Sequence, residues 1–255
     1  MAGSTPHLAA LYDIHGNLPA LEAVLAVLDG ERGDAPMADI VVGGDMVPGP
    51  MPRETLDRLL ALGDRARFIR GNCDRLVVDA FDGRPLSHLP GEVRASFEWT
   101  AAQLDARHRD FLAALPTTLV REVRGLGAVC FCHATPRSDE EIVTGRTPAE
   151  RLRAVLAGVR ESVVVCGHTH MQFDRRVGGV RLVNAGSVGM PFGAPGAHWL
   201  RLGPDVEALH TRYDLERCAE SVRATWYPQR ADFASRNVLS PPSELEMLAA
   251  FEAGA

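Results

Sequence analysis

Two short pairs of residues in this sequence are suited to binding a divalent metal ion. Asp13 and His15 form one pair, His168 and His170 form the other, and one residue separates the members of each pair. Residues at positions i and i+2 of an extended backbone project to the same side, and carboxylates and imidazoles are common ligands of divalent transition metals. Each pair is therefore expected to reach one small volume, although a single pair of this kind is a common coincidence.

Three further segments carry side chains of metal-ligand type. Asp45 follows two glycines, Asn72 follows one glycine, and His133 follows an apolar segment. Together with the two pairs they form a series of five elements, each at the end of an expected strand. In open α/β sheets, ligands bind beyond the carboxyl ends of the strands. We therefore expect these side chains to converge on one site.

The elements that position these residues alternate at the start of the chain. The apolar and amphipathic segments predict strand 7–12, helix 19–28, strand 40–42, helix 52–62 and strand 67–69. This order is typical of a β-α-β-α-β unit with parallel strands. Asn17 followed by Pro19 indicates the start of the first helix, because Asn caps free amides and Pro is tolerated in the first turn.

The pattern changes after residue 74. Residues 75–116 lack strand signals and are expected to form an inserted helical cap, with helices at 92–104 and 106–115. The second half predicts strands at 118–123, 129–133, 163–166, 173–177, 180–184, 198–202 and 206–213, interrupted by a helix at 148–158. This order favours an α/β (α+β) fold, a four-layer sandwich of two packed mixed β-sheets flanked by helices, over one parallel sheet.

The length of 255 residues is at the upper end of what one hydrophobic core supports. We expect one domain over residues 1–228, which contains the cap, and a C-terminal tail over residues 229–255. Ser243 and Glu246 have the spacing of a capping box, which predicts a short helix in this tail.

The composition excludes several classes of function. The net charge of −6, without a basic stripe, argues against a dedicated nucleic-acid-binding surface. The sequence contains no Lys, which excludes a P-loop lysine and a Schiff-base lysine. Five cysteines without regular spacing do not indicate a disulfide framework. No apolar run approaches the ~20 residues that span a membrane, and residues 1–10 lack the features of a signal peptide, so we expect a cytoplasmic protein.

The five-element series Asp-x-His, Gly-Gly-Asp, Gly-Asn, a lone His and Gly-His-x-His resembles the calcineurin-like metallophosphoesterases over roughly residues 7–190. The resemblance implies a hydrolase that cleaves phosphodiester or phosphoanhydride bonds with two divalent metal ions, for which Mn, Fe and Zn are candidates. It implies two ligand sets that share a bridging Asp45: Asp13, His15, Asp45 and His170 for one metal, and Asp45, Asn72, His133 and His168 for the other. Two cations ~3.5–4 Å apart can acidify a bridging water and stabilise an in-line phosphoryl displacement.

One position departs from the common pattern of the family. Many members have His after Gly-Asn, where it is the general acid, whereas this sequence has Cys73. Asp74, which orients that His in those members, lacks this partner, while Asn72 can keep an amide donor for a phosphoryl oxygen. A thiol with a pKa of ~8.5 donates a proton poorly near neutral pH. We therefore expect a preference for stable leaving groups, as in phosphoanhydrides and activated diesters.

The Gly-Asn-Cys-Asp segment is similar to small bacterial and archaeal phosphodiesterases, and the helical insertion with residues 186–192 is similar to diadenosine tetraphosphatase-like enzymes. These similarities imply a small phosphorylated substrate, with a nucleotide as one candidate. Arg70 is a candidate phosphate contact, and a solvated or ion-paired Arg is the alternative. Phe97, Trp99 and Phe192 could stack on a base, although such aromatic residues more often belong to a core. Four histidines outside the motifs are expected to be structural: His88, His108, His198 and His210.

Two other functions stay open at this point. A non-catalytic binding scaffold on the same fold, similar to a retromer subunit, is favoured only by Cys73, because all seven expected ligands are present. A phosphoprotein phosphatase is a second alternative within the enzymes. The sequence does not indicate an oligomeric state.

Overall fold

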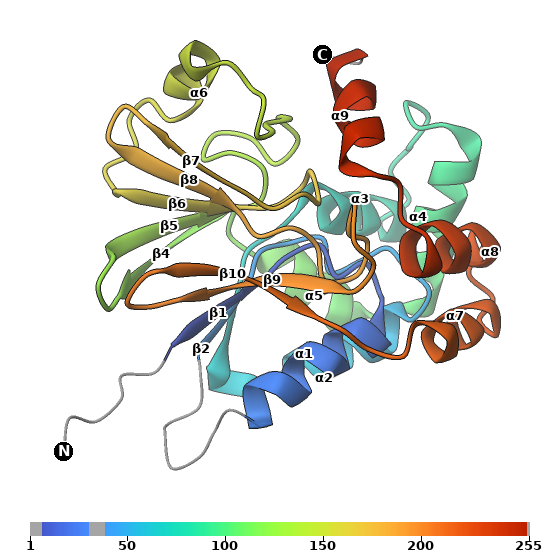
Figure 1. The fold of residues 1–255 in the computed structure, drawn as a ribbon. Coiled ribbons are helices and arrows are strands. Elements are labelled where there is room, and N and C mark those ends of the chain that lie inside the picture. Colours follow the sequence, from blue (N-terminus) through green and yellow to red (C-terminus); the bar gives the residue numbers. More distant parts are fainter. Residues whose placement is uncertain (1–6, 31–38, 254–255) are drawn as a thin grey trace.

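The computed structural model describes residues 7–30 and 39–253 of the chain. These residues form two five-stranded mixed β-sheets that pack face to face, with helices on the outer sides (Figure 1). The predicted fold class is therefore confirmed. Residues 1–6, which are part of the segment expected to lack a signal peptide, lie outside the described residues, as do residues 31–38 and the last two residues of the predicted tail.

The first sheet has the strand order β10-β9-β1-β2-β3. Its parallel strands are β1 (Leu8–Leu11), β2 (Asp39–Val42) and β3 (Ala66–Phe68), and its antiparallel strands are β9 (Ala197–Leu202) and β10 (Val206–Thr211). Helices α1 (Leu18–Gly30) and α2 (Pro52–Leu60) follow β1 and β2. The predicted Asn17 cap is present, because the side-chain oxygen of Asn17 accepts the N–H of Ala20 at 3.2 Å.

The second sheet has the strand order β4-β5-β6-β8-β7. Its parallel strands are β5 (Gly127–Cys132), β6 (Val163–Cys166) and β8 (Val180–Asn184), and its antiparallel strands are β4 (Thr118–Val123) and β7 (Phe173–Val177). Helix α6 (Ala149–Val155) precedes β6. Tyr12 is fully buried between the sheets, and its hydroxyl donates to the carbonyl of Val165 at 3.1 Å. The ends of β1 and β6 therefore lie near each other.

The segment expected as a helical cap contains α3 (Asn72–Phe81), α4 (Gly91–Gln103) and α5 (Ala106–Ala114). These helices bury Leu76, Phe97 and Leu112 in the same hydrophobic cluster as Leu21 of α1 and Leu56 of α2. They therefore extend the core beneath the first sheet. Because α3 begins at Asn72, its first turn lies at the candidate site.

The C-terminal part is more helical than the sequence analysis anticipated. It contains α7 (Leu215–Arg223), α8 (Arg230–Asp232), a π-helical segment (Phe233–Leu239) and α9 (Glu244–Ala253). Phe233 and Val238 pack against Cys218 and Val222 of α7 in a separate small core. Among the described residues, the helices are too short or too polar to cross a membrane.

The predicted capping box begins helix α9. The side chain of Glu246 accepts the N–H of Ser243 at 2.8 Å, and the hydroxyl of Ser243 accepts the N–H of Glu246 at 3.3 Å. The two residues thus satisfy backbone donors that would otherwise be free at the start of a helix.

Candidate metal centre

The candidate site lies where β1, β2, β5 and β6 end. Backbone hydrogen bonds continue between the loops that follow β1 and β2: the N–H groups of Asp13 and His15 donate to the carbonyls of Gly44 and Asp45 at 3.1 and 3.0 Å. On the second sheet, the N–H of Gly167 donates to the carbonyl of His133 at 2.8 Å. These bonds fix the loops of each sheet relative to one another, and with them the side chains they carry.

The backbone at the site is unusual for residues other than glycine. Five described non-glycine residues have φ in the left-handed region, between 48° and 66°, and all five are expected ligands: Asp13, His15, Asp45, His168 and His170. Such conformations cost on the order of 1–3 kcal/mol each and concentrate at functional sites. The expectation that each pair projects from an extended strand is therefore wrong in its geometry. The pairs converge through tight turns that follow the ends of β1 and β6.

The carboxylate of Asp13 is anchored at one oxygen and free at the other. Its Oδ2 accepts the backbone N–H of His168 at 2.9 Å. Its Oδ1 is buried without a hydrogen-bond partner and lies 3.3 Å from Nε2 of His170 and 3.9 Å from Nε2 of both His15 and His133. A buried carboxylate oxygen without a donor is costly, so this oxygen is suited to a cation.

The carboxylate of Asp45, at the centre of the site, is also anchored at one oxygen only. Its Oδ1 accepts the backbone N–H of Cys73 at 2.8 Å. Its Oδ2 lies 3.3 Å from Nε2 of His133 and 3.9 Å from Nε2 of His15. Asp45 therefore stands between the imidazoles of the two expected ligand sets.

Backbone carbonyls orient three of the four imidazoles. Each carbonyl accepts one ring N–H and leaves the other ring nitrogen available, which is the usual arrangement of histidine ligands. The three hydrogen bonds are His133 Nδ1 to Gly43 at 2.9 Å, His170 Nδ1 to Met190 at 2.7 Å, and His168 Nε2 to Glu140 at 3.1 Å. The sequence analysis did not find these carbonyl partners.

Asn72 and Cys73 complete the site from the first turn of α3. Oδ1 of Asn72 lies 3.1 Å from Nε2 of His133, and its Nδ2 makes only a weak contact with Sγ of Cys73 at 3.7 Å. The structure thus brings all seven expected ligands together. Three groups of side chains have potential ligand atoms within 4.8 Å of one another: Asp13, His15 and His170; Asp45, His133 and His168; and His15, Asp45 and Cys73.

The buried carboxylates shift the protonation of the imidazoles. Burial opposes a positive charge on His133, but Asp45 outweighs it and raises the pKa of His133 to about 10. Burial and the neighbouring His170 lower the pKa of His15 to about 4. Burial and the negative charge of Asp45 raise the pKa of the Cys73 thiol well above its usual range. The carboxylates therefore attract positive charge into a space lined by nitrogen and oxygen donors, and this donor set fits divalent cations.

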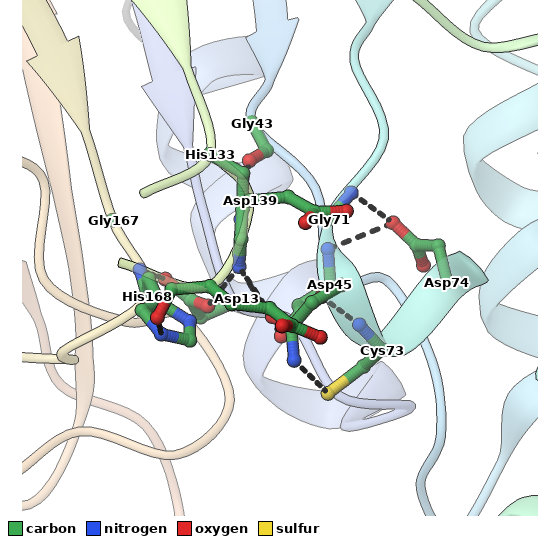
Figure 2. A network of polar contacts seen from close by, with 12 residues as sticks. Asp13, Gly43, Asp45, Gly71, Cys73, Asp74, His133, Asp139, Gly167 and His168 are labelled. Carbon is green, nitrogen blue, oxygen red and sulfur yellow. Dashed lines mark hydrogen bonds and ion pairs between the residues drawn. The ribbon is translucent and has the colours of Figure 1, made fainter. Parts of the chain in front are cut away.

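Asp74, which lacks the His partner that it has in the family pattern, is bound by backbone N–H groups instead. Its carboxylate accepts the N–H groups of Asp45, Met46, Val47 and Gly71 at 2.8, 3.0, 3.3 and 3.0 Å. Figure 2 shows this carboxylate next to the nitrogens of Asp45 and Gly71, away from the imidazoles. Although it lacks a His partner, Asp74 is fully bonded and joins the Asp45 loop to α3.

Gly71 and Gly167 allow the loops to approach this closely. A Cβ atom at Gly71 would collide with the carboxylate of Asp45, and a Cβ atom at Gly167 would collide with that of Asp13. Glycine at these two positions is therefore required by contact with the two central carboxylates.

Arg70 lies in a cavity of about 190 Å³ beside the site, which His133 also lines. Its Nε is buried without a hydrogen-bond partner. Arg75, in the same cavity, pairs with Asp139 at 3.0 Å. Among the described residues Arg70 has no ion-pair partner, which leaves its guanidinium group available to an anion.

Residues outside the motifs are distributed as follows. His108 is buried between Asp57 and Asp105, and the rings of His198 and His210 stack on each other at 4.5 Å. Among the three aromatic residues considered for base stacking, Phe97 lies in the core and Trp99 contacts Tyr227. Phe192 stacks on His170, with ring centroids 5.1 Å apart.

The described fold has relatives among solved structures. A metallophosphoesterase from Sphaerobacter thermophilus is 26% identical with a TM-score of 0.71, and the alignment covers 91% of this chain and 100% of that chain. A hypothetical protein from Pyrococcus horikoshii is 21% identical with a TM-score of 0.77, over 94% of this chain and 100% of that one. A "putative diadenosine tetraphosphatase" is 17% identical with a TM-score of 0.54, over 84% and 97% of the two chains.

A search of curated protein sequences finds no match. The family model of the calcineurin-like phosphoesterase superfamily domain, in contrast, matches residues 7–203, which include the seven converging side chains. The chain therefore belongs to the calcineurin-like phosphoesterase superfamily.

Proposed function

We propose that this protein hydrolyses phosphodiester or phosphoanhydride bonds with the help of two divalent cations. The observation that carries the proposal is the position of Asp45 between two sets of imidazoles, with one carboxylate oxygen anchored to a backbone N–H and the other facing both sets. Membership in the phosphoesterase superfamily supports hydrolysis in general. The two cations and the class of substrate are proposed in addition to this general activity.

The proposed ligands divide between two cations. Asp13, His15 and His170 would hold one, Asn72, His133 and His168 would hold the other, and Asp45 would contact both. When bound, the cations would acidify water and offset the negative charge of the phosphoryl group. We leave their identity among Mn, Fe and Zn open, because nitrogen and oxygen ligands accept all three.

Two further side chains are proposed to contact the substrate. Nδ2 of Asn72 has only a weak sulfur contact, so it can donate to a phosphoryl oxygen. Arg70 lacks an ion-pair partner among the described residues and faces the cavity beside His133. A guanidinium group forms strong, charge-assisted hydrogen bonds with phosphate oxygens, so we assign Arg70 to the phosphate part of the substrate.

Because Cys73 has no imidazole, we infer that the substrate has a good leaving group. A proton donor is needed most when the departing oxygen is a basic alkoxide and least when it is a phosphate or an aryl oxide. We therefore place dinucleoside polyphosphates and activated diesters ahead of alkyl monoesters. The fold shared with a "putative diadenosine tetraphosphatase" agrees with this choice, which is based on Cys73.

The test is a hydrolysis panel with the full chain after loading with Mn, Fe or Zn. The substrates are diadenosine tetraphosphate, bis-p-nitrophenyl phosphate, a 2′,3′-cyclic nucleotide, an alkyl monoester and a phosphopeptide. We expect anhydride and aryl diester cleavage, two metals per chain by elemental analysis, and loss of activity with a chelator that is reversed by metal. No cleavage with any metal would favour a binding scaffold, and cleavage of the phosphopeptide alone would favour a phosphoprotein phosphatase.

A further inference from the structure

A second cavity lies between the C-terminal end of α9 and the loop that precedes α6. Its volume is about 280 Å³, near the lower limit of small-molecule sites. Ile142, Pro148 and Phe251 give it apolar walls, and Arg146 and Arg151 add two guanidinium groups. A cavity of this size and composition suits a flat ring joined to an anionic group.

Aromatic contacts connect this cavity to the metal centre. Phe192 stacks on the proposed ligand His170, with the ring planes inclined by 25°. Phe251 lies next in line, with its ring centroid 6.4 Å from that of Phe192. Phe251 is therefore only two ring contacts away from the metal centre.

The opposite wall of the cavity is also joined to the metal centre. His168 donates to the carbonyl of Glu140, and the hydroxyl of Thr169 donates to the carbonyl of Val143 at 3.2 Å. The loop that carries Ile142 and Arg146 thus continues from residues that orient the proposed ligands. A molecule in the cavity would lie between Phe251, whose ring contacts the ring of Phe192 on His170, and the loop whose carbonyls accept from His168 and Thr169.

Core packing does not account for the position of α9, because none of its residues is buried. The N–H of Gly193 donates to the carbonyl of Pro242 at 2.8 Å just before the helix begins. Near its end, Arg146 pairs with Glu252 at 3.9 Å, and both side chains are more than half exposed. This long, exposed ion pair contributes little to stability, so Arg146 can exchange Glu252 for a phosphate at small cost.

We propose that this cavity binds the base of a nucleotide substrate whose phosphate chain extends to the metal centre. Phe251 stacks on the base, and Arg146 and Arg151 contact the phosphates nearest to the nucleoside. Stacking of a base on an aromatic side chain strengthens binding by about five- to 150-fold. The inference rests on the proposed function and adds the part of the substrate that the metal centre does not recognise.

The test compares two non-hydrolysable ligands by calorimetry, with metal in excess. These are adenosine 5′-(α,β-methylene)diphosphate and methylenediphosphonate, which share the diphosphate mimic but differ by the nucleoside. We expect the nucleotide to bind the wild-type chain at least about tenfold more tightly. Phe251→Leu keeps an apolar side chain at the end of α9 but removes the ring, and should reduce this preference about fivefold or more.

Leu245→Ala is the matched control, because Leu245 is 64% exposed on the same helix and does not line the cavity. Equal affinity of the two ligands for the wild-type chain, or an unchanged preference in Phe251→Leu, would overturn the inference. If bis-p-nitrophenyl phosphate is cleaved but the nucleoside adds no affinity, only the base site fails. If nothing is cleaved and the preference depends on Phe251, the base site stands and the proposed hydrolysis fails.

Discussion

Asp74 accepts the backbone N–H of Asp45 at 2.8 Å and thereby holds the loop that carries the central carboxylate of the site (Figure 2). Its four hydrogen bonds from backbone N–H groups occupy the four lone-pair positions that a carboxylate offers. Asp74 is fully buried. Because it is buried and bound to the Asp45 loop, Asp74 positions Asp45.

We predict that Asp74→Asn destabilises the protein and lowers its metal content. The carboxamide can accept at its oxygen, but its NH₂ group opposes the N–H groups that face the other oxygen. The loss of two hydrogen bonds to a charged group costs about 3–6 kcal/mol, or roughly 6–24 °C in Tm for a chain of this size. Calorimetry and elemental analysis would measure both effects.

The control for this substitution is Asp110→Asn, which removes a carboxylate that is 72% exposed and paired with Arg109. Surface pairs of this kind contribute little, so its Tm should stay near that of the wild type. An Asp74→Asn protein with unchanged Tm and metal content would show that these hydrogen bonds do not hold the loop.

The second prediction concerns Asp45. Asp45→Ala removes the carboxylate between the two ligand sets and should abolish hydrolysis, with metal affinity reduced by more than about 100-fold. Turnover and bound metal should fall together. His88→Ala is the matched control, because His88 is exposed and outside the motifs, and it should keep wild-type activity. Full activity of Asp45→Ala would contradict the proposed site.

The sequence was sufficient to predict which side chains converge, because each of the seven follows a strand in a fixed order. It was not sufficient to predict how they converge. The left-handed φ values of His15 and His170 arise from contacts between loops, which no i, i+2 spacing encodes. The sequence also does not indicate that the carbonyls of Gly43 and Met190 bind the ligand imidazoles. Every residue has a carbonyl group, and only the fold determines which one accepts from a histidine.

Helix α7 is not among the elements expected from the sequence, although its pattern is visible there. Its buried residues Cys218, Ala219 and Val222, preceded by Leu215, follow the i, i+3, i+4, i+7 spacing of a helix face. Asp214 caps the helix by accepting the N–H of Arg217 at 3.0 Å. This signal was present in the sequence and could have been recognised. The π-helical segment that packs on α7 depends on tertiary contacts and could not.

The third prediction concerns Arg70. If its unpaired guanidinium contacts a substrate phosphate, Arg70→Ala should raise KM for phosphoanhydrides by about 10- to 100-fold, the range for hydrogen bonds to a charged group. Arg70→Lys should recover only part of this loss, because Lys cannot form the bidentate contact. Arg121→Ala, which removes a partly exposed pair with Asp39, is the control. An unchanged KM in Arg70→Ala would place the phosphates elsewhere.

The last prediction concerns Cys73, which occupies the position where many family members have a general acid. Without an efficient proton donor, the rate should depend steeply on the pKa of the leaving group, so aryl diesters and phosphoanhydrides should react much faster than alkyl monoesters. The slope of log kcat/KM against leaving-group pKa is the measurement. Equal rates for alkyl and aryl substrates, with chemistry shown to be rate-limiting, would mean that another side chain donates the proton.

Introducing imidazole by Cys73→His should raise the rates of the slow substrates most and flatten this slope. A well-placed general acid contributes about 10²–10⁴-fold. We expect the gain to lie at or below the lower end of this range, because the acceptor positions of Asp74 are all used by backbone N–H groups and none remains to orient the new ring. Cys73→Ser is the matched control, since it is similar in size but adds no imidazole, and its slope should stay as steep as that of the wild type. If Cys73→His left the slope unchanged while metal content and Tm were preserved, the side chain at position 73 would not face the leaving group.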